Sequence, residues 1–297
     1  MKRRRVLVGL AAIIAILGFF FLLFFAIDRM FGGPGQLTFG DKIAVVEIKG
    51  VITQSSEIIE EIHQYLEDGN VKAILLRVDS PGGGVGPSQE IYREIVKAKK
   101  RKKIVTSMGS VAASGGYYIA AASDLIVANP GTITGSIGVV MEFTNLEELL
   151  KKIGIKGVVL KGGENKDIGS PFREMTAEER RIMQEVIDNV HRQFIDAVAD
   201  GRKGKMNRND VMKVADGRIF TGERAKELGL VDRMGNLQDA IDMAADLVGI
   251  TGKPSLLYPK RKFSIWDLLL QEIASAVVRT LGEKGFELNY ILSSPAG

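Results

Sequence analysis

The chain has 297 residues, 45% of them hydrophobic, so it is long enough to bury a full core. Its formal net charge of +4 is accounted for by the stretch KRRR at residues 2–5, which leaves 36 Lys and Arg against 36 Asp and Glu. A balanced charge without a basic stripe gives no support for nucleic-acid binding. The lack of cysteine excludes disulfides and thiolate nucleophiles, and the two histidines form no zinc-protease pattern. We therefore expect no metal and no cofactor.

The N-terminal segment has the pattern of a membrane anchor. Residues 6–27 are 22 consecutive residues without a charge, and at about 1.5 Å per residue such a helix crosses the roughly 30 Å hydrocarbon core. The basic cluster before it predicts that residues 1–5 stay cytoplasmic and that the rest of the chain lies outside. The alternative is a cleaved signal peptide, but the apolar run exceeds the usual length of about 7–15 residues and lacks an Ala-x-Ala-like site. We expect an uncleaved cell-membrane anchor, followed by a linker at 28–40.

The next part of the chain alternates strand and helix patterns. Apolar, mostly β-branched runs predict strands, and apolar residues at helical spacing predict helices between them. The expected strands are 43–48, 73–78 and 104–108, with helices at 55–69, 88–99 and 114–122. Further strand candidates are DLIVA (124–128), TGSIGVV (134–140) and GVVLK (157–161). This order predicts an α/β domain over residues 41–250, with helices packed on a mainly parallel sheet.

The second half of the domain is more helical. Thr176 and Glu179 form a capping-box pattern before a long helix over 177–200, whose apolar face includes Phe194. Shorter helices are expected at 208–215, 222–228 and 237–248. The C-terminal extension, residues 251–297, contains a largely apolar helix at 264–281. Its pattern fits packing on the core, on another subunit or on a membrane surface, and does not choose among them.

A glycine-rich segment, DSPGGGVGPS at 79–88, follows the second predicted strand. Three consecutive glycines permit positive φ and let another backbone come close. The segment is typical of an ordinary strand-to-helix turn. It matches neither the phosphate-binding loop nor the dinucleotide fingerprint. A surface of N–H groups that receives a peptide or holds an oxyanion is the remaining functional interpretation.

A second small-residue segment, MGSVAASGGYYIAAAS at 108–123, follows the third predicted strand. It places Ser114 at the expected start of a helix, where unpaired N–H groups favour an attacking alkoxide and a negative intermediate. Helix capping is the alternative role, since serine is a preferred N-cap residue. Either role fits this segment taken alone.

A serine nucleophile needs a base. His63 and His191 both fall inside predicted helices on largely charged faces, so we expect surface or boundary positions and disfavour a Ser–His–Asp triad. A lysine can serve when burial lowers its pKa towards neutrality. Lys166 lies in a glycine-rich loop beside Glu164 and Asp167, whose carboxylates must point elsewhere if its amine is to be neutral. A solvated loop lysine is the alternative.

Taken together, these segments resemble the signal peptide peptidase A type of serine protease, within the Clp-protease/crotonase superfamily. The resemblance covers most of residues 41–250 and is carried by segments in the family's order. They are DSPGGGV (79–85), MGSVAASGGYYIA (108–120), TGSIGVV (134–140), GGENKDIGSPFREMT (162–176) and GRIFTGERAKELGLVDRMG (217–235).

The resemblance implies a role for each matching residue. Ser114 matches the nucleophile, Lys166 the general base and Ser136 a hydroxyl that orients the lysine amine. An oxyanion hole is implied at the Gly82–Gly83 turn and the Gly115 amide, and which of the first two donates stays open.

The resemblance also implies a fold of repeated ββα units and a ring-like homo-oligomer with active sites built partly across subunit boundaries. The implied function is that of a membrane-anchored endopeptidase that degrades remnant signal peptides or misfolded segments. A crotonase-type acyl-CoA enzyme and a non-catalytic membrane scaffold are the alternatives.

Overall fold

A computed structural model of the protein describes residues 16–23 and 40–259. Residues 16–23, inside the predicted anchor, are helical. The rest of the anchor, the segment 1–5, nearly all of the linker and the predicted helix at 264–281 lie outside the described residues. Within the two described ranges, no helix is both long enough and apolar enough to cross a membrane.

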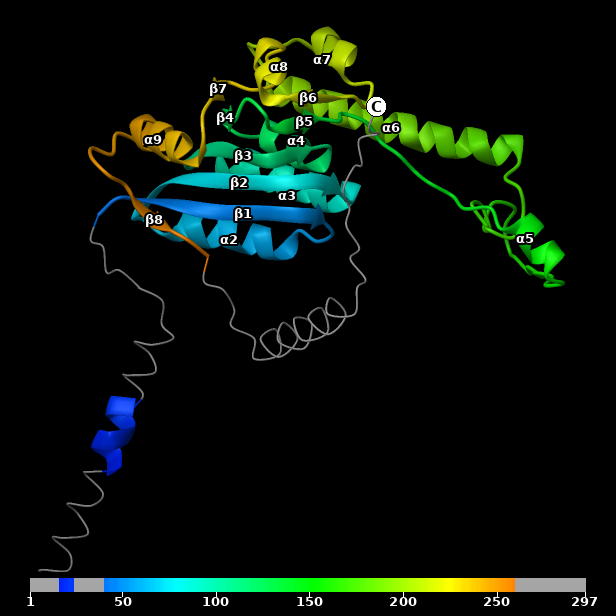
Figure 1. Cartoon of the computed structure of the whole chain (residues 1–297), viewed down its shortest axis with the longest axis horizontal. Coiled ribbons are helices and arrows are strands. Elements are labelled where there is room, and N and C mark those ends of the chain that lie inside the picture. Colours follow the sequence, from blue (N-terminus) through cyan, green and yellow to red (C-terminus); the bar gives the residue numbers. More distant parts are fainter. Residues whose placement is uncertain (1–15, 24–39, 260–297) are drawn as a thin grey trace, which may run out of the picture. The chain divides into compact units, whose positions relative to one another are not determined.

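The strands of the described residues form one sheet, which is mainly parallel as predicted (Figure 1). Its order is β6-β5-β3-β2-β1-β8, with β4 pairing β3 and β7. The pairs β1–β2, β2–β3, β3–β4, β3–β5 and β4–β7 are parallel, and the pair β5–β6 is antiparallel. The strands are β1 (Lys42–Ile52), β2 (Val71–Gly83), β3 (Lys103–Ala113), β4 (Leu125–Ala128), β5 (Ile133–Gly135), β6 (Ile219–Thr221), β7 (Arg233–Met234) and β8 (Ser255–Leu257).

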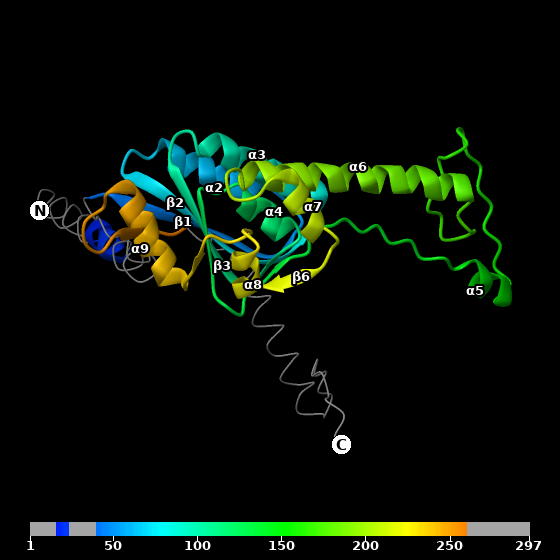
Figure 2. The same ribbon diagram turned by 90° about the horizontal axis from the view of Figure 1, so that it is seen from above.

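Helices cover both faces of this sheet, which explains the continuous apolar runs of its central strands. Side chains alternate between the faces along each strand. Ile43, Val45 and Leu75 pack with α9 (Leu237–Val248) in one buried cluster. The intervening residues are equally buried, and α2 (Ser56–Glu67) and α3 (Val85–Ala98) lie on the opposite side of β1 and β2 (Figure 2).

The long helix α6 (Ala177–Gly201) packs on the sheet layer only through its C-terminal half. There Phe194 stacks on Tyr118 of the buried helix α4 (Gly115–Ala121), with ring centroids 4.7 Å apart. At the end of α6, an added Cβ on Gly201 would meet the Ala121 carbonyl oxygen at 2.0 Å, so the two helices touch by backbone. The helices α7 (Arg208–Val214) and α8 (Gly222–Glu227) follow it.

The N-terminal half of α6 leaves the sheet and carries an extension, which we call the arm and define as residues 141–183. It includes α5 (Glu147–Lys152), which lies beyond the sheet in both views (Figures 1 and 2). The expected strand GVVLK does not form here; residues 157–161 have no regular structure and are exposed. The short α5 was not predicted.

The boundary between β2 and α3 also differs from the prediction. The turn expected from Asp79 onward is strand through Gly83, because β1 is longer than predicted and pairs with it as far as Ile52–Gly83. Helix α3 consequently begins at Val85 rather than at Ser88. This longer strand brings the glycine-rich segment beside the end of β3.

Candidate active site

Ser114 sits in a strained turn between β3 and α4. Its backbone has φ 51° and ψ −121°, a conformation that is costly for a residue with a side chain. It is the N-cap of α4, but its side chain makes no capping hydrogen bond. Capping therefore does not explain the serine, and the alternative role that the sequence left open is removed. A strained strand-to-helix turn that presents a hydroxyl is the geometry of an exposed nucleophile.

Two backbone hydrogen bonds and a bulge hold this turn. The N–H of Ser114 donates to the Gly135 carbonyl at 2.9 Å, and the Ser114 carbonyl accepts from Tyr118 at 2.8 Å. Before the turn, the pairing of β2 with β3 jumps from Val78–Met108 to Ser80–Ala112, so β3 bulges there. The Asp79 carboxylate fills this bulge and accepts from the Val111 N–H at 3.0 Å. Asp79 thus holds the bulge that precedes the Ser114 turn, and sequence reasoning had assigned this residue no such role.

The glycines of β2 lie directly against Ser114. A Cβ added to Gly82, whose φ is 103°, would lie 2.7 Å from the Gly115 nitrogen and 2.9 Å from the Ser114 Cβ. A Cβ on Gly115 would in turn meet the buried Ser88 hydroxyl at 2.5 Å and the Gly83 nitrogen at 3.3 Å. Only glycine allows this approach. The structure thus brings Gly82, Gly83 and Gly115 together with Ser114, as the resemblance implied.

Ser136 reaches the same place from β5. Its φ is 50°, and its N–H donates to the Arg218 carbonyl at 2.8 Å. Among the described residues, Ser114 and Ser136 are the two non-glycine residues with positive φ. Their side chains line one cavity of about 480 Å³. Both residues proposed from sequence therefore meet at one site.

The walls of this cavity come from α3, α4, α6 and the extended segment after β5. Apolar and polar side chains both line it, and the apolar or aromatic ones are Val85, Tyr118, Val139, Val140, Ile187, Val190 and Phe194. Such a cleft suits an apolar peptide segment, because burial of its side chains against these walls is favourable.

His191 also lines the cavity, which is a boundary position of the kind predicted but lies at the Ser114 site. The residue is half-buried, and its Nε2 atom is buried without a hydrogen-bond partner among the described residues. No hydrogen bond therefore links this atom to the Ser114 hydroxyl. His63, by contrast, is exposed and pairs with Glu94 at 3.0 Å, as a surface histidine would.

Lys166 is not among the residues that line the Ser114 cavity. It is exposed in the arm, in a run of turns that ends before α6. The next residue, Asp167, is held by Arg173 and by Lys161, so its carboxylate is engaged away from the Lys166 amine. Arg173 also binds Glu179 in the first turn of α6. These contacts fix the lysine segment to the N-terminal end of that helix.

The distance along α6 separates the two predicted dyad members within one chain. Glu179 and Phe194 are 15 positions apart in the helix, which corresponds to about 22 Å at 1.5 Å per residue. Phe194 packs beside the Ser114 turn, whereas Glu179 anchors the lysine segment through Arg173. The structure of a single chain therefore does not bring Lys166 to Ser114.

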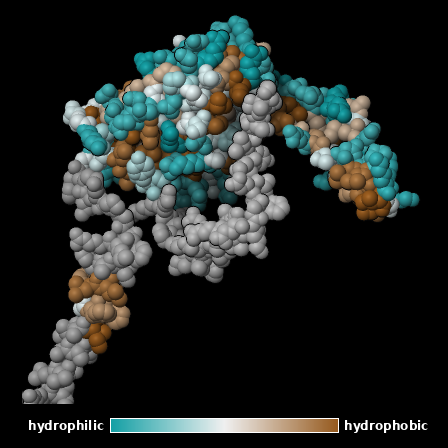
Figure 3. All heavy atoms as spheres, viewed as in Figure 1, coloured by the Kyte–Doolittle hydropathy of each residue, from teal (hydrophilic) through white to brown (hydrophobic). Residues whose placement is uncertain are grey.

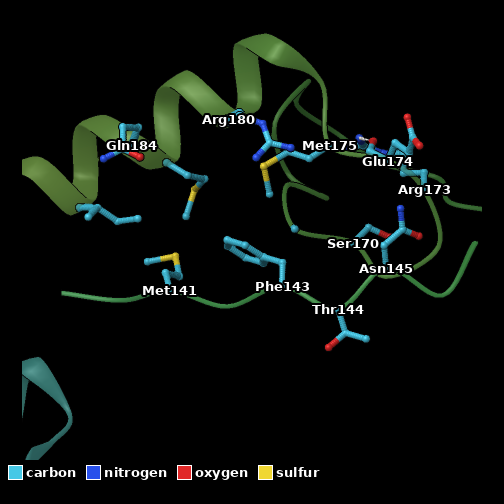
Figure 4. Close-up of a pocket in the computed structure, with 13 residues that line it drawn as sticks. Met141, Phe143, Thr144, Asn145, Ser170, Arg173, Glu174, Met175, Arg180 and Gln184 are labelled. Atoms are coloured by element: carbon cyan, nitrogen blue, oxygen red, sulfur yellow. Dashed lines mark hydrogen bonds between the residues drawn. The ribbon is translucent and has the colours of Figure 1, made fainter.

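The arm encloses a second cavity of about 500 Å³ between residues 141–145 and the first turns of α6 (Figure 4). Met141, Phe143 and Met175 extend into it, and Arg180 lies on the helix above (Figure 4). Gln184 and Ile187 line both cavities, so the two follow one another along α6.

Comparison with known proteins identifies the class of this site. The profile of peptidase family S49 matches residues 96–251, and that of Clp protease matches residues 42–128. The chain therefore belongs to peptidase family S49. It is a serine protease of the signal peptide peptidase A type, and its sheet agrees with a Clp-protease-like fold.

Three relatives illustrate the match. "Putative protease slr0021" of Synechocystis is 46% identical over 218 residues, covering 73% of this chain and 78% of the relative. "Putative signal peptide peptidase SppA" of Enterococcus faecium is 38% identical over 238 residues, covering 73% and 69%. "Protease 4" of Salmonella typhi is 35% identical over 254 residues, covering 82% of this chain and 40% of the longer relative. These matches favour the peptidase over the acyl-CoA enzyme and the scaffold.

Proposed function

We propose that the protein is a membrane-anchored endopeptidase in which Ser114 is the nucleophile and Lys166 the general base. The observation that carries this proposal is the strained Ser114 turn, whose uncapped side chain lines a cavity beside Ser136. Strain in a turn persists only where the surroundings hold it, and such sites are commonly functional.

Gly83 and Gly115 are our proposed oxyanion donors. The N–H of Gly82 is already engaged by the Ser80 hydroxyl at 3.1 Å. The N–H of Gly84 donates to the Ile52 carbonyl of β1 at 2.8 Å. Because successive N–H groups along a strand point to opposite sides, the Gly83 N–H points away from β1 and towards the side of Ser114. Gly115 begins α4 and has no intrahelical acceptor for its N–H. Gly83, unlike Gly82, lines the cavity.

The separation along α6 supports a lysine supplied by a second copy of the chain. The arm that carries Lys166 extends beyond the sheet, and its end exposes several large apolar side chains (Figure 3). They include Leu149, Ile153, Ile155, Val158 and Leu160, of which the last is 95% exposed. Exposed apolar surface of this kind marks an interaction site. A ring of identical subunits, each arm reaching the next Ser114 cavity, would cover it and complete each site.

The chemistry then follows from these positions. The neutral Lys166 amine takes the proton of the Ser114 hydroxyl as its oxygen attacks the peptide carbonyl, and the Gly83 and Gly115 N–H groups stabilise the resulting oxyanion. The protonated amine then gives its proton to the leaving nitrogen. The amine next activates a water molecule, which breaks the acyl-serine ester and restores the hydroxyl. Ser136 orients the amine throughout.

The sequence supports the anchoring and the substrate class of this proposal. Residues 6–27 would hold the N-terminus on the cytoplasmic side of the cell membrane and the catalytic domain outside it. A relative bears the name signal peptide peptidase, and the apolar side chains in the cavity wall suit the apolar segments of remnant signal peptides. Membrane-released or misfolded peptides with similar side chains would also fit.

Labelling with a fluorophosphonate probe tests the nucleophile. We expect the full-length protein in detergent to be labelled and to cleave apolar peptides, and Ser114→Ala to lose both while keeping its fold. Lys166→Ala should fold normally and lose turnover, since an exposed arm lysine contributes little to the core. Equal labelling of wild type and Ser114→Ala, or near-normal turnover by Lys166→Ala, would refute the dyad. A folded, assembled wild type that neither labels nor cleaves would indicate a scaffold.

A further inference from the structure

The polar side chains of the Ser114 cavity fall into two groups. Those of the first group have hydrogen-bond partners within the chain: Ser88 bonds the Gly84 carbonyl, Gln89 bonds Gln193, Tyr118 bonds Gln89, Gln184 bonds Asp188, and Asp216 binds Arg218. In the part of the chain that the structure describes, three lack a side-chain hydrogen bond, namely Ser114, Ser136 and the buried Nε2 of His191. The first two have roles in the proposed mechanism, and the histidine has none.

The buried Nε2 of His191 has an unfavourable environment in the chain, because it lacks a hydrogen-bond partner among the described residues. A buried polar atom without a partner loses its hydration and gains no hydrogen bond in return, so it destabilises the folded state. Its Nε2 is the only buried side-chain nitrogen or oxygen without a partner among the described residues. The torsion that turns an imidazole ring about its Cβ–Cγ bond is soft. A small rotation would therefore direct a ring nitrogen to a partner inside the cavity.

The position of His191 on α6 indicates which part of a peptide it would meet. On the helix face it lies one turn after Ile187 and one turn before Phe194, and Asp188 lines the same wall. The facing wall is the extended segment Gly138–Val139–Val140. A peptide lying extended along that segment would project alternate side chains towards α6. His191 is then a polar point in a side-chain pocket.

We infer that His191 is a specificity-determining residue, which hydrogen-bonds a substrate side chain carrying a hydroxyl or an amide. This inference rests on the proposed peptidase site and names one feature of its substrates. A neutral imidazole both donates and accepts, so it suits the side chains of Thr, Ser, Asn or Gln within an otherwise apolar segment. A pocket built to bond a polar group discriminates against the analogue that leaves its own polar atom unpaired.

Matched peptides test this directly, using full-length protein in detergent. In each pair, one position on either side of the cleaved bond carries Thr or its isostere Val, and kcat/KM is measured for both. We expect wild type to prefer Thr about tenfold at one position, with the ratio falling to about one in His191→Leu. His191→Gln keeps hydrogen-bonding capacity and should retain a preference. The matched control is His63→Leu, which changes the exposed histidine and should behave as wild type.

Several results would overturn the inference. A Thr/Val ratio that is the same in wild type and His191→Leu at every position would exclude side-chain recognition. A uniform loss of kcat/KM for all peptides would assign the imidazole to the peptide main chain instead. A change in assembly size with an unchanged ratio would assign it to contact between copies. Fluorophosphonate labelling of Ser114 is read in each variant, so failure of the nucleophile is distinguished from failure of the specificity role.

Discussion

The backbone N–H of Ser114 donates to the carbonyl of Gly135, the residue directly before Ser136, at 2.9 Å. This bond ties the end of β3 to the end of β5, where the two strands pair as Ala113–Gly135. Both serines follow their strands with positive φ, and both side chains enter one cavity. Two turns that are strained individually thus hold each other in place.

Removing the Ser136 hydroxyl should slow catalysis without weakening substrate binding. Because this hydroxyl would orient the lysine amine, its loss should lower kcat at least about tenfold and leave KM nearly unchanged. Ser136→Gly is the cleaner variant, since glycine accepts the positive φ of this position. Ser136→Ala removes the same hydroxyl but keeps the Cβ, and serves as the comparison. A normal kcat in Ser136→Gly would remove the residue from the mechanism.

Adding a methyl group at Gly82 should displace the Ser114 turn. The new Cβ would lie 2.7 Å from the Gly115 nitrogen, and φ 103° is unfavourable for alanine. If the oxyanion donors shift, kcat should fall by about 10²–10³. The matched control is Gly86→Ala, which meets no atom within 4 Å. Steady-state kinetics and thermal unfolding of both variants check this, and an active, stable Gly82→Ala enzyme would contradict the assignment.

The contacts that anchor the lysine segment to α6 should weaken at acid pH. Hydrogen bonds from Arg173 hold the pKa of Asp167 well below its usual range and lower the pKa of Glu179 to about 2. Carboxyls with lowered pKa values contribute stability at neutral pH, and that contribution is lost as the pH falls from about 4 towards 2. We expect the amides of residues 161–179 to lose protection over this window, measured as exchange rates relative to the intrinsic rate at each pH.

The same loss should appear at neutral pH in Arg173→Gln. Arg181→Gln is a matched control on the same helix, because Arg181 forms exposed ion pairs with Glu178 and Glu185. Proteolytic cleavage within the arm and peptidase activity provide two measurements. If the two variants behave alike, the Asp167–Arg173–Glu179 contacts do not position Lys166.

Much of the sheet could be predicted because its strands are buried on both faces and so form continuous apolar runs. The C-terminal limit of β2 could not be predicted, because Pro81 and Gly82 are typical of a turn. Pairing with β1 nevertheless extends the strand to Gly83. The run GVVLK has strand composition but no strand partner in the described part of the chain, and Leu160 is almost fully exposed. Its apolar character therefore does not mark a core strand, and we propose that it belongs to the contact between copies.

The nucleophile region could be predicted because Ser114 and its glycines are close in sequence or flank neighbouring strands. The position of His191 in the cavity wall could not be predicted. A helical pattern with charged neighbours does not reveal that α4 packs against this part of α6. A buried histidine nitrogen becomes visible only once the cavity exists. The Ser114–Lys166 pairing was implied by the family resemblance alone, and a single folded chain does not bring the two residues together; we propose that a second copy does.

Co-assembly of two inactive variants tests the central claim most directly. Full-length Ser114→Ala and Lys166→Ala, carrying different tags, are co-expressed and purified through both tags. If each site takes its serine from one copy and its lysine from the next, about a quarter of the sites in a random ring are intact, and peptidase activity returns to about that fraction of wild type. Activity no greater than that of the two variants measured separately, in assemblies of the wild-type size, would contradict a dyad built from two chains.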